Sequence, residues 1–196
     1  MPRTAAETRR HVLDVAHELF YWDGIRATGI DRVASGAGVA PTTLYRLFES
    51  KDDLIAAYVE RASAETREWI TGAIDRAGPD PVQQVLALFD ETLVQIQPDR
   101  CRGCAFLMTL AEFPDPELAA HKLAVAAKSW VRECLGGIAG KLAAAGSVTE
   151  PEIVADRLAL VFEGVNATAQ ALGADGPALQ ARPLVELILA DATRRD

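Results

Sequence analysis

The sequence predicts an all-α protein with about nine helices. Pro and Gly divide the 196 residues into segments, and almost every segment is rich in Ala, Leu, Glu and Arg, which favour helix. Apolar residues recur at helical spacing, and no stretch of useful length alternates polar and apolar residues as a half-buried strand would. Apolar residues make up 49% of the chain, which is enough for a sizeable core.

Three helices are expected at the N-terminus. The first covers about residues 4–22, because apolar side chains there recur three and four positions apart. These side chains are Val12, Val15, Ala16, Leu19 and Phe20. The second follows Thr28, and Asp31 three residues later completes a capping-box pattern. The third begins at Pro41, because proline favours the first helical turn, and Gly38 allows the tight connection before it.

Six further helices are expected. Capping-box patterns open two of them, at Ser50 with Asp53 and at Thr149 with Glu152, and Asp80 precedes Pro81 at the start of another. The expected ranges are about 51–76, 81–97, 103–112, 117–145, 151–172 and 178–194. The last two carry apolar stripes, which we expect to pair with a second copy of the chain. The stripes are Ile153, Val154, Leu158, Val161, Phe162 and Val165, then Leu184, Val185, Ile188 and Leu189.

Charge and cysteine content restrict the function classes. The formal net charge is -8, divided into -1 for residues 1–61 and -7 for residues 62–196, so any nucleic-acid binding should be strongly salt-sensitive. Three cysteines do not suggest a disulfide framework. The start of the chain lacks the apolar stretch of a signal peptide, and no run of 18 apolar residues suggests a membrane span. We expect a cytoplasmic protein without membrane contact.

The segment from Thr28 to Lys51 is the most informative part of the chain. Its second helix carries Thr42, Thr43, Tyr45 and Arg46 on a face without apolar residues. Two short helices at a steep angle, with a polar outer face on the second, suit insertion into the major groove of DNA. A plain pair of packed helices is the alternative interpretation of the same pattern.

This segment resembles the N-terminal region of the TetR family of transcriptional regulators. The matching positions span about residues 9–59 in the family's order and spacing. They are Phe20, Gly24, Thr28, Ile30, Ala34, Ala37, Gly38, Val39, Thr43, Leu44, Tyr45, Phe48, Lys51 and Leu54. The resemblance implies a helix-turn-helix DNA-binding domain over residues 1–50. It implies a ligand-binding and dimerisation domain over residues 51–196, and release from a double-stranded DNA operator by a small molecule.

Physical arguments give roles to the DNA-facing side chains. Arg46 is the best candidate for reading a base, because a guanidinium binds guanine O6 and N7 together. Thr43 and Tyr45 carry hydroxyls that can donate to phosphate, and Lys51 places a cation at a helix start. The expected DNA-binding residues are Thr28, Pro41, Thr42, Thr43, Tyr45, Arg46 and Lys51.

A small, largely apolar effector is expected in the C-terminal part. By resemblance to the family, a cavity lined by apolar and aromatic groups with few polar ones would receive it. The candidate lining residues are Trp69, Phe89, Phe106, Met108, Phe113, Trp130, Phe162 and Asn166. Core packing is the other interpretation of these aromatic residues.

Two other function classes stay open. Cys101 and Cys104 have the C-x-x-C spacing of redox pairs, so a thiol-sensing regulator is one alternative. An all-α small-molecule-binding protein or enzyme that does not bind DNA is the other. We expect no enzyme, cofactor or metal site, because the serines and histidines form no catalytic or metal-ligand pattern.

Overall fold

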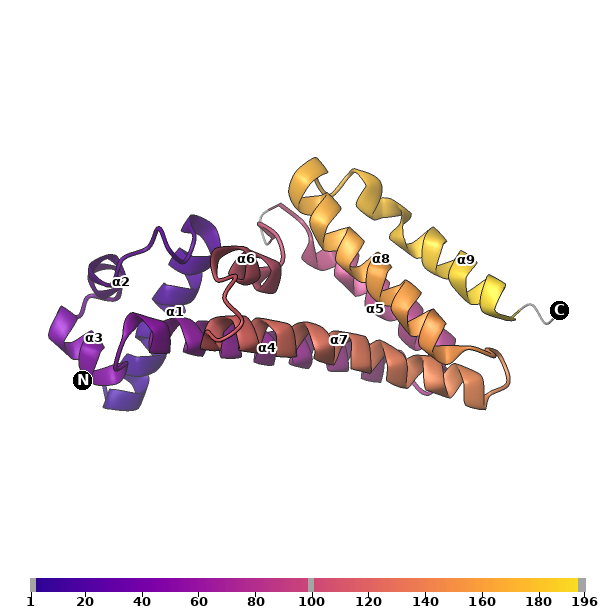
Figure 1. The fold of residues 1–196 in the computed structure, drawn as a ribbon, viewed down its shortest axis with the longest axis horizontal. Coiled ribbons are helices and arrows are strands. Elements are labelled where there is room, and N and C mark those ends of the chain that lie inside the picture. The colour runs from indigo at the N-terminus through magenta and orange to yellow at the C-terminus, as the bar shows by residue number, and fades with distance from the viewer. Residues whose placement is uncertain (1–2, 99–100, 194–196) are drawn as a thin grey trace. The chain divides into compact units, whose positions relative to one another are not determined.

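The computed structural model describes residues 3–98 and 101–193, and this part of the chain is all-helical, as predicted. It contains nine α-helices and one short 3-10 helix, η1, without any strand (Figure 1). The bounds are α1 Ala5–Asp23, α2 Ile30–Ala37, α3 Pro41–Leu47, α4 Lys51–Arg76, α5 Pro81–Gln95, α6 Ala105–Glu112, α7 Ala119–Ala144, α8 Pro151–Leu172, η1 Pro177–Gln180 and α9 Ala181–Thr193. None of the described helices combines the length and apolar character needed to cross a bilayer.

Several helix starts follow the predicted local chemistry. Pro41 occupies the first turn of α3, and the Asp80 side chain caps α5. At the start of α4, Ser50 Oγ accepts a hydrogen bond from the Asp53 amide at 3.0 Å, and the helix runs for the predicted 26 residues. The Asp53 carboxylate accepts from the Glu49 amide at 3.2 Å, so the reciprocal bond of the box lies one residue earlier than expected.

Two predicted capping boxes are wrong. The Thr28 side chain is fully buried, and its hydroxyl donates to the Leu19 carbonyl oxygen at 3.4 Å instead of accepting from the helix. Gly29 is therefore the N-cap of α2 and provides no side-chain bond. At α8 the N-cap is Glu150, also without a side-chain bond, so Thr149 does not cap the helix.

Three helices begin later than predicted, and one of them is α6, which starts at Ala105 instead of residue 103. Asp115 Oδ1 accepts from the Glu117 amide at 2.9 Å, and this local turn delays the start of α7 to Ala119. Residues 177–180 form η1 rather than the first turn of the last α-helix. Their hydrogen bonds join residues three positions apart, as where the Leu179 amide donates to Gly176 at 3.2 Å.

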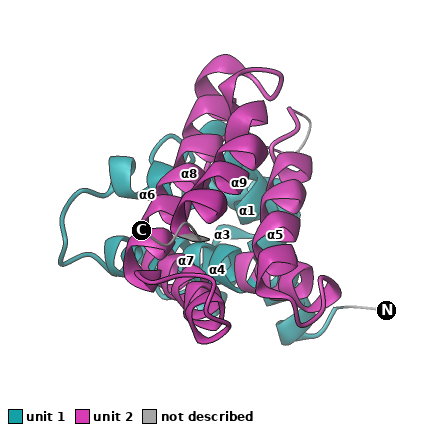
Figure 2. Cartoon of the chain, turned by 90° about the vertical axis from the view of Figure 1, so that its right-hand side faces the viewer, with its two compact units in different colours: residues 1–64, 105–126 teal, residues 65–104, 127–196 magenta. Residues whose placement is uncertain are grey.

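The chain divides into two compact units (Figure 2). Unit 1 comprises residues 1–64 and 105–126, and unit 2 comprises residues 65–104 and 127–196. Unit 1 thus contains α1 to α3, the first half of α4, α6 and the start of α7. Its second segment joins the N-terminal helices from a distant part of the sequence, and the predicted functional division at residue 50 stays a prediction.

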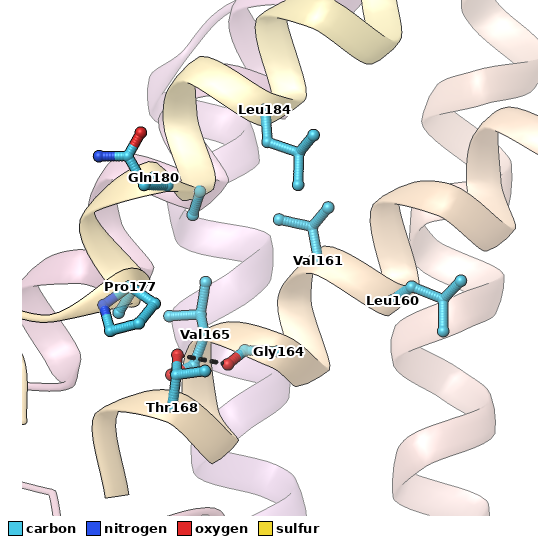
Figure 3. Close-up of a pocket in the computed structure, with 10 residues that line it drawn as sticks. Leu160, Val161, Gly164, Val165, Thr168, Pro177, Gln180 and Leu184 are labelled. Carbon is cyan, nitrogen blue, oxygen red and sulfur yellow. Dashed lines mark hydrogen bonds between the residues drawn. The ribbon is translucent and has the colours of Figure 1, made fainter. Parts of the chain in front are cut away.

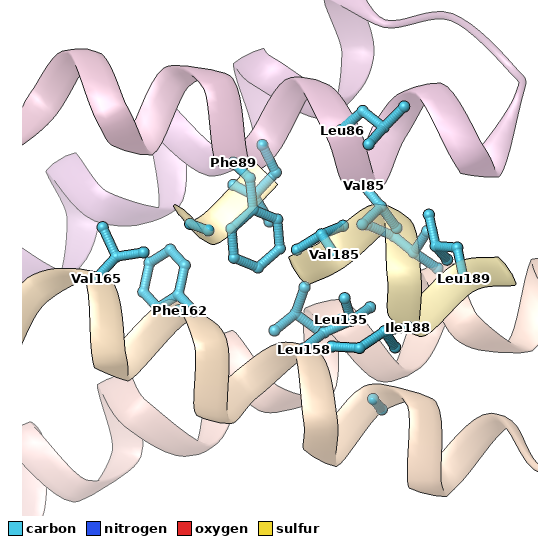
Figure 4. Close-up of a cluster of buried hydrophobic side chains, with 14 of the residues drawn as sticks. Val85, Leu86, Phe89, Leu135, Leu158, Phe162, Val165, Val185, Ile188 and Leu189 are labelled. Atoms are coloured by element: carbon cyan, nitrogen blue, oxygen red, sulfur yellow. The ribbon is translucent and has the colours of Figure 1, made fainter. Parts of the chain in front are cut away.

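The core of unit 2 forms where α5, α8 and α9 pack together (Figure 4). Val85, Phe89, Leu158 and Val185 are completely or almost completely buried there, and Leu135 adds a side chain from α7. Burial of a side chain of this size stabilises the fold by about 1.5–3 kcal/mol. Most side chains of the predicted apolar stripes of α8 and α9 lie in this core, so they stabilise the fold of the chain itself.

The core of unit 1 places α1 against α2 and α3. Val12, Ala16 and Phe20 form the buried face of α1, and the Phe20 and Tyr58 rings meet edge to face at 5.6 Å between centroids. Gly36 lets α2 approach α1, since a Cβ there would lie 2.9 Å from a methyl carbon of Val15. The three N-terminal helices are thus held by side-chain packing, with close backbone approach at one point.

Glu112, the last residue of α6, fastens the second segment of unit 1 to the first. Its carboxylate accepts from the Ile25 amide at 3.0 Å and from the Arg26 amide at 2.6 Å. Arg26 Nε donates in return to the Glu112 carbonyl oxygen at 2.7 Å, and its guanidinium lies 5.0 Å from the centroid of the Phe113 ring. These partly exposed contacts join residues that are 86 and 87 positions apart in the chain.

The turn between α2 and α3 depends on a glycine. Gly38 has φ 65° and ψ 33°, the left-handed conformation, and its amide donates to the Ser35 carbonyl oxygen at 3.1 Å. The Val39 amide donates to Ala34 at 3.0 Å, which closes the end of α2. A Cβ at Gly38 would meet nothing within 4 Å, so the backbone conformation alone selects glycine here.

We predict that Gly38→Ala lowers the free energy of unfolding by about 1–2 kcal/mol, because L-residues are strained in the left-handed region. Gly137→Ala is the matched control: it lies inside α7 with open space around its Cβ position, so it should raise stability by about 0.5–1 kcal/mol. Urea unfolding followed by circular dichroism measures both. Equal stability of the two variants would contradict the role of the turn.

Candidate nucleic-acid interface

The third helix is anchored by its buried side. Leu44 and Phe48 are both 0% exposed, and Phe48 ends the helix because its backbone is extended, with φ -138° and ψ 120°. The Arg9 guanidinium from α1 lies 4.5 Å from the centroid of the Phe48 ring. These contacts hold the middle and the C-terminal end of α3 and so determine which residues face outward.

The outer face of α3 is polar and open. Pro41, Thr42 and Arg46 are exposed, Thr43 is half-buried, and the Tyr45 side chain is 52% exposed despite its size. The Tyr45 hydroxyl can bind a phosphate, and the Arg46 guanidinium can bind a phosphate or a base edge. The structure therefore brings five of the seven predicted DNA-binding residues together.

The other two predicted residues lie apart from this face. Thr28 is 0% exposed, and its hydroxyl bonds inside the protein, so its side chain is not available to a phosphate. Lys51 is half-buried, and its Nζ lies 3.5 Å from the Arg26 carbonyl oxygen. The prediction for Thr28 is corrected: this residue braces the end of α1 against the start of α2.

The eight predicted ligand-binding residues are divided between the two units, and their role stays a prediction. Phe106, Met108 and Phe113 belong to unit 1, whereas Trp69, Phe89, Trp130, Phe162 and Asn166 belong to unit 2. In unit 2 the Phe162 ring packs edge to face against Trp69 at 6.3 Å and against Phe89 at 6.4 Å. These three rings fill the core, which is the packing interpretation of their sequence pattern.

The remaining predicted lining residues have different surroundings. Trp130 lies under the Arg67 guanidinium at 4.5 Å, and the Asn166 amide group donates to the Phe162 carbonyl oxygen at 3.0 Å within its own helix. Phe113, by contrast, lines an open cavity of about 610 Å³ in unit 1. No sequence pattern indicates that Arg26 shares this cavity with Phe113, because the two residues lie far apart in the chain.

The cysteines are free thiols in the structure. Cys101, Cys104 and Cys134 are all half-buried, and burial raises the pKa of the Cys134 thiol. Gly103, between the first two, has φ 143°, and a Cβ there would lie 2.3 Å from Gln170 Oε1. Among the described residues no group of three or more Cys, His, Asp or Glu side chains could hold a metal ion. The thiol-sensing interpretation therefore stays a prediction.

Helices α8 and α9 and the short η1 between them carry exposed apolar side chains. Ile153, Leu160, Leu172, Leu179, Leu184 and Leu187 are between 43% and 73% exposed. Leu160, Val161 and Leu184 line a groove that continues along Gly164 and Thr168 toward η1 (Figure 3). Concentrated apolar exposure of this kind marks a protein contact surface.

The residues predicted to form the dimer contact need a correction. Most members of the two predicted stripes, among them Val154, Leu158, Phe162 and Val185, are buried in the chain's own core. Ile153, Val161 and Leu184 remain for an external contact, together with Leu160 and Leu187, which the stripes did not include. The regular spacing of apolar residues indicated one face of each helix, and most of that face packs inside the chain.

Comparisons with known proteins agree with this geometry. Residues 12–58 match the family described as bacterial regulatory proteins, tetR family. The HTH-type transcriptional regulator AcrR of Shigella flexneri is 38% identical over 64 residues. That match covers 33% of this chain and 30% of AcrR, so the chain spans about a third of the curated relatives that it matches.

Solved structures extend the similarity over the whole chain. SCO4454, a TetR-family transcriptional regulator from Streptomyces coelicolor, superimposes with a TM-score of 0.90 at 30% identity, covering 96% of this chain and 97% of that one. The TetR-type regulator sav143 from Streptomyces avermitilis gives a TM-score of 0.79 at 28% identity, with 96% and 99% coverage. The chain therefore belongs to the TetR family of transcriptional regulators and carries the family's N-terminal helix-turn-helix DNA-binding domain.

Proposed function

We propose that this chain acts as a homodimeric repressor that binds a near-palindromic operator and is released by a small molecule. The observation that carries the proposal is the exposed polar face of α3, whose inner side is held by Leu44 and Phe48. A fixed helix with this face suits the major groove, and a symmetric dimer would present two of them to successive grooves. The family and fold are those of a regulator and not of an enzyme.

Each outward residue of α3 has a distinct proposed role. Arg46 reads a guanine through two hydrogen bonds, and Pro41 and Thr42 touch thymine methyl groups. Thr43 and Tyr45 donate to phosphates, which fixes the register of the helix on the duplex without reading sequence. Lys51 contributes to phosphate binding once its ammonium leaves the Arg26 carbonyl oxygen.

The apolar surface of α8 and α9 is the proposed dimer contact. Two copies related by a two-fold axis would bury the exposed leucines, and the groove beside Leu160 would receive a side chain of the partner. This arrangement forms a four-helix bundle from two helices of each chain. Dimerisation is what sets the distance between the two reading helices.

Release by an effector requires only that the ligand prefers the conformation that does not fit DNA. A coupling free energy of about 1–3 kcal/mol would weaken operator binding roughly 5- to 150-fold. The direct test of the whole proposal is selection of bound fragments from random duplex DNA by the purified protein. A recovered inverted repeat would support it, and recovery of unselected sequence at low ionic strength would refute it.

We predict that Arg46→Ala weakens binding to the selected operator by about 1–3 kcal/mol and relaxes the preference at one base pair in each half-site. Arg76→Ala is the control, because Arg76 is exposed at the end of α4, outside the α8–α9 surface, and pairs with Glu91 at 2.8 Å. Fluorescence anisotropy with a panel of single-substituted operators measures the effect. An equal loss on every sequence would show that Arg46 does not read a base.

We predict that Tyr45→Phe weakens binding to all duplexes alike, by about 1 kcal/mol or roughly fivefold, because only a phosphate hydrogen bond is lost. The ring itself remains, so packing on the rest of α3 is preserved. The same anisotropy panel, including an unrelated duplex, measures this change. Unaltered affinity would assign Tyr45 a packing role.

We predict that Leu160→Glu converts the dimer to a monomer, because burying an unpaired carboxylate at the contact is unfavourable. Val94→Glu is the matched control, since Val94 is 51% exposed but lies on α5, outside the α8–α9 surface. Sedimentation equilibrium measures both variants. If the Leu160→Glu variant remains a dimer, the dimer contact does not lie on the α8–α9 surface.

A further inference from the structure

Unit 1 contains an open cavity whose lining includes Phe113 of the predicted ligand-binding residues and Lys51 of the predicted DNA-binding residues. It has a volume of about 610 Å³ and lies where the start of α4, the end of α6 and the start of α7 meet. Its lining comes from residue 26, residues 51–55 and residues 113–120. Sites for small organic ligands have volumes of about 300–1,000 Å³, so this cavity has the size of a binding site.

The cavity wall is chemically divided. One part is apolar, formed by Ile55, Phe113 and Leu118, of which Ile55 is 2% and Phe113 9% exposed. The other part carries the cations Arg26 and Lys51. A ligand that matches both parts has an apolar body and a negatively charged end.

The cationic part is held in position before any ligand arrives. Arg26 Nε donates to the Glu112 carbonyl oxygen at 2.7 Å, and the guanidinium lies over the Phe113 ring at 5.0 Å. Lys51 Nζ lies 3.5 Å from the carbonyl oxygen of the same Arg26. Each cation therefore donates to a backbone carbonyl oxygen, that of Glu112 for Arg26 and that of Arg26 for Lys51, next to the apolar wall.

The cavity lining carries charges of both signs, with two cations, Arg26 and Lys51, and two carboxylates. The carboxylates belong to Asp52 and Glu117, and Glu117 pairs with Lys122 at 2.9 Å. The first turn of α7, which supplies Ala119 and Ala120 to the lining, contains no acidic residue. Its amide groups add positive potential to that of Arg26 and Lys51.

We propose that this cavity binds an amphipathic organic acid, with the carboxylate between Arg26 and Lys51 and a flat apolar body against Phe113 and Ile55. Arginine and lysine bind carboxylates through charge-assisted hydrogen bonds, and the partly enclosed wall strengthens them. The bound acid draws the Lys51 ammonium away from DNA and so weakens operator binding. This last step rests on the proposed function, in which Lys51 meets a phosphate.

The binding test uses 2-naphthoate as the probe and the full chain without DNA. Isothermal titration calorimetry should give one site per chain, and the neutral analogue 2-naphthamide should bind at least about tenfold more weakly because it lacks the charge. Equal affinity for the two compounds, or no binding of either, would overturn the proposed site.

Location is tested by filling the cavity. Ala119 is an exposed lining residue, so Ala119→Trp should reduce 2-naphthoate affinity at least about tenfold by occupying the space. Ala126→Trp is the control, since Ala126 is exposed on the same helix outside the lining. An unchanged affinity of Ala119→Trp, or an equal loss in both variants, would place the probe elsewhere.

The regulatory step is tested separately with the selected operator. Saturating 2-naphthoate should weaken operator binding at least about fivefold, and the operator should weaken 2-naphthoate binding by the same factor. Probe binding with unchanged operator affinity would overturn the regulatory step. If the DNA selection recovers no operator, the proposed function is refuted. The calorimetric test of 2-naphthoate binding does not depend on that result.

Discussion

The exposed polar face of α3 depends on the burial of two side chains. Leu44 and Phe48 are completely enclosed, and they lie on the side of α3 opposite Tyr45 and Arg46. Because the helix has only 7 residues, it would not persist without this anchoring. The left-handed turn at Gly38 brings α3 to the position where both side chains reach the core. Exposure of the polar groups is thus a consequence of apolar packing beneath them.

The Glu112 contact extends this argument to a distant part of the chain. A carboxylate that accepts from the amides of Ile25 and Arg26 joins the end of α6 to the loop between α1 and α2. The same Arg26 holds a cation at the wall of the unit 1 cavity. One short loop therefore touches the DNA-binding helices, α6 and a candidate ligand site, which makes it the natural place for coupling between them.

The sequence was informative wherever a feature depends on neighbouring residues. Pro41 and Asp80 mark helix starts by their own backbone and side-chain chemistry, and the polar face of α3 follows from helical spacing. It was misleading where a distant residue competes. Threonine is a common helix cap, but the Thr28 hydroxyl donates a hydrogen bond to the Leu19 carbonyl oxygen. Phe89 and Phe162 could line a cavity or fill a core, and only their mutual packing decides. The Glu112 contact leaves no sequence pattern.

The exposed leucines of α8 and α9 have a consequence for the chain before it finds a partner. Leu160 and Leu187 are 73% and 66% exposed, so an isolated copy leaves a large apolar area in water. Association would cover that area, and by mass action the folded fraction would then rise with protein concentration. Dilution would act as a destabiliser, and newly synthesised copies would be most vulnerable to proteolysis when the cell contains few of them.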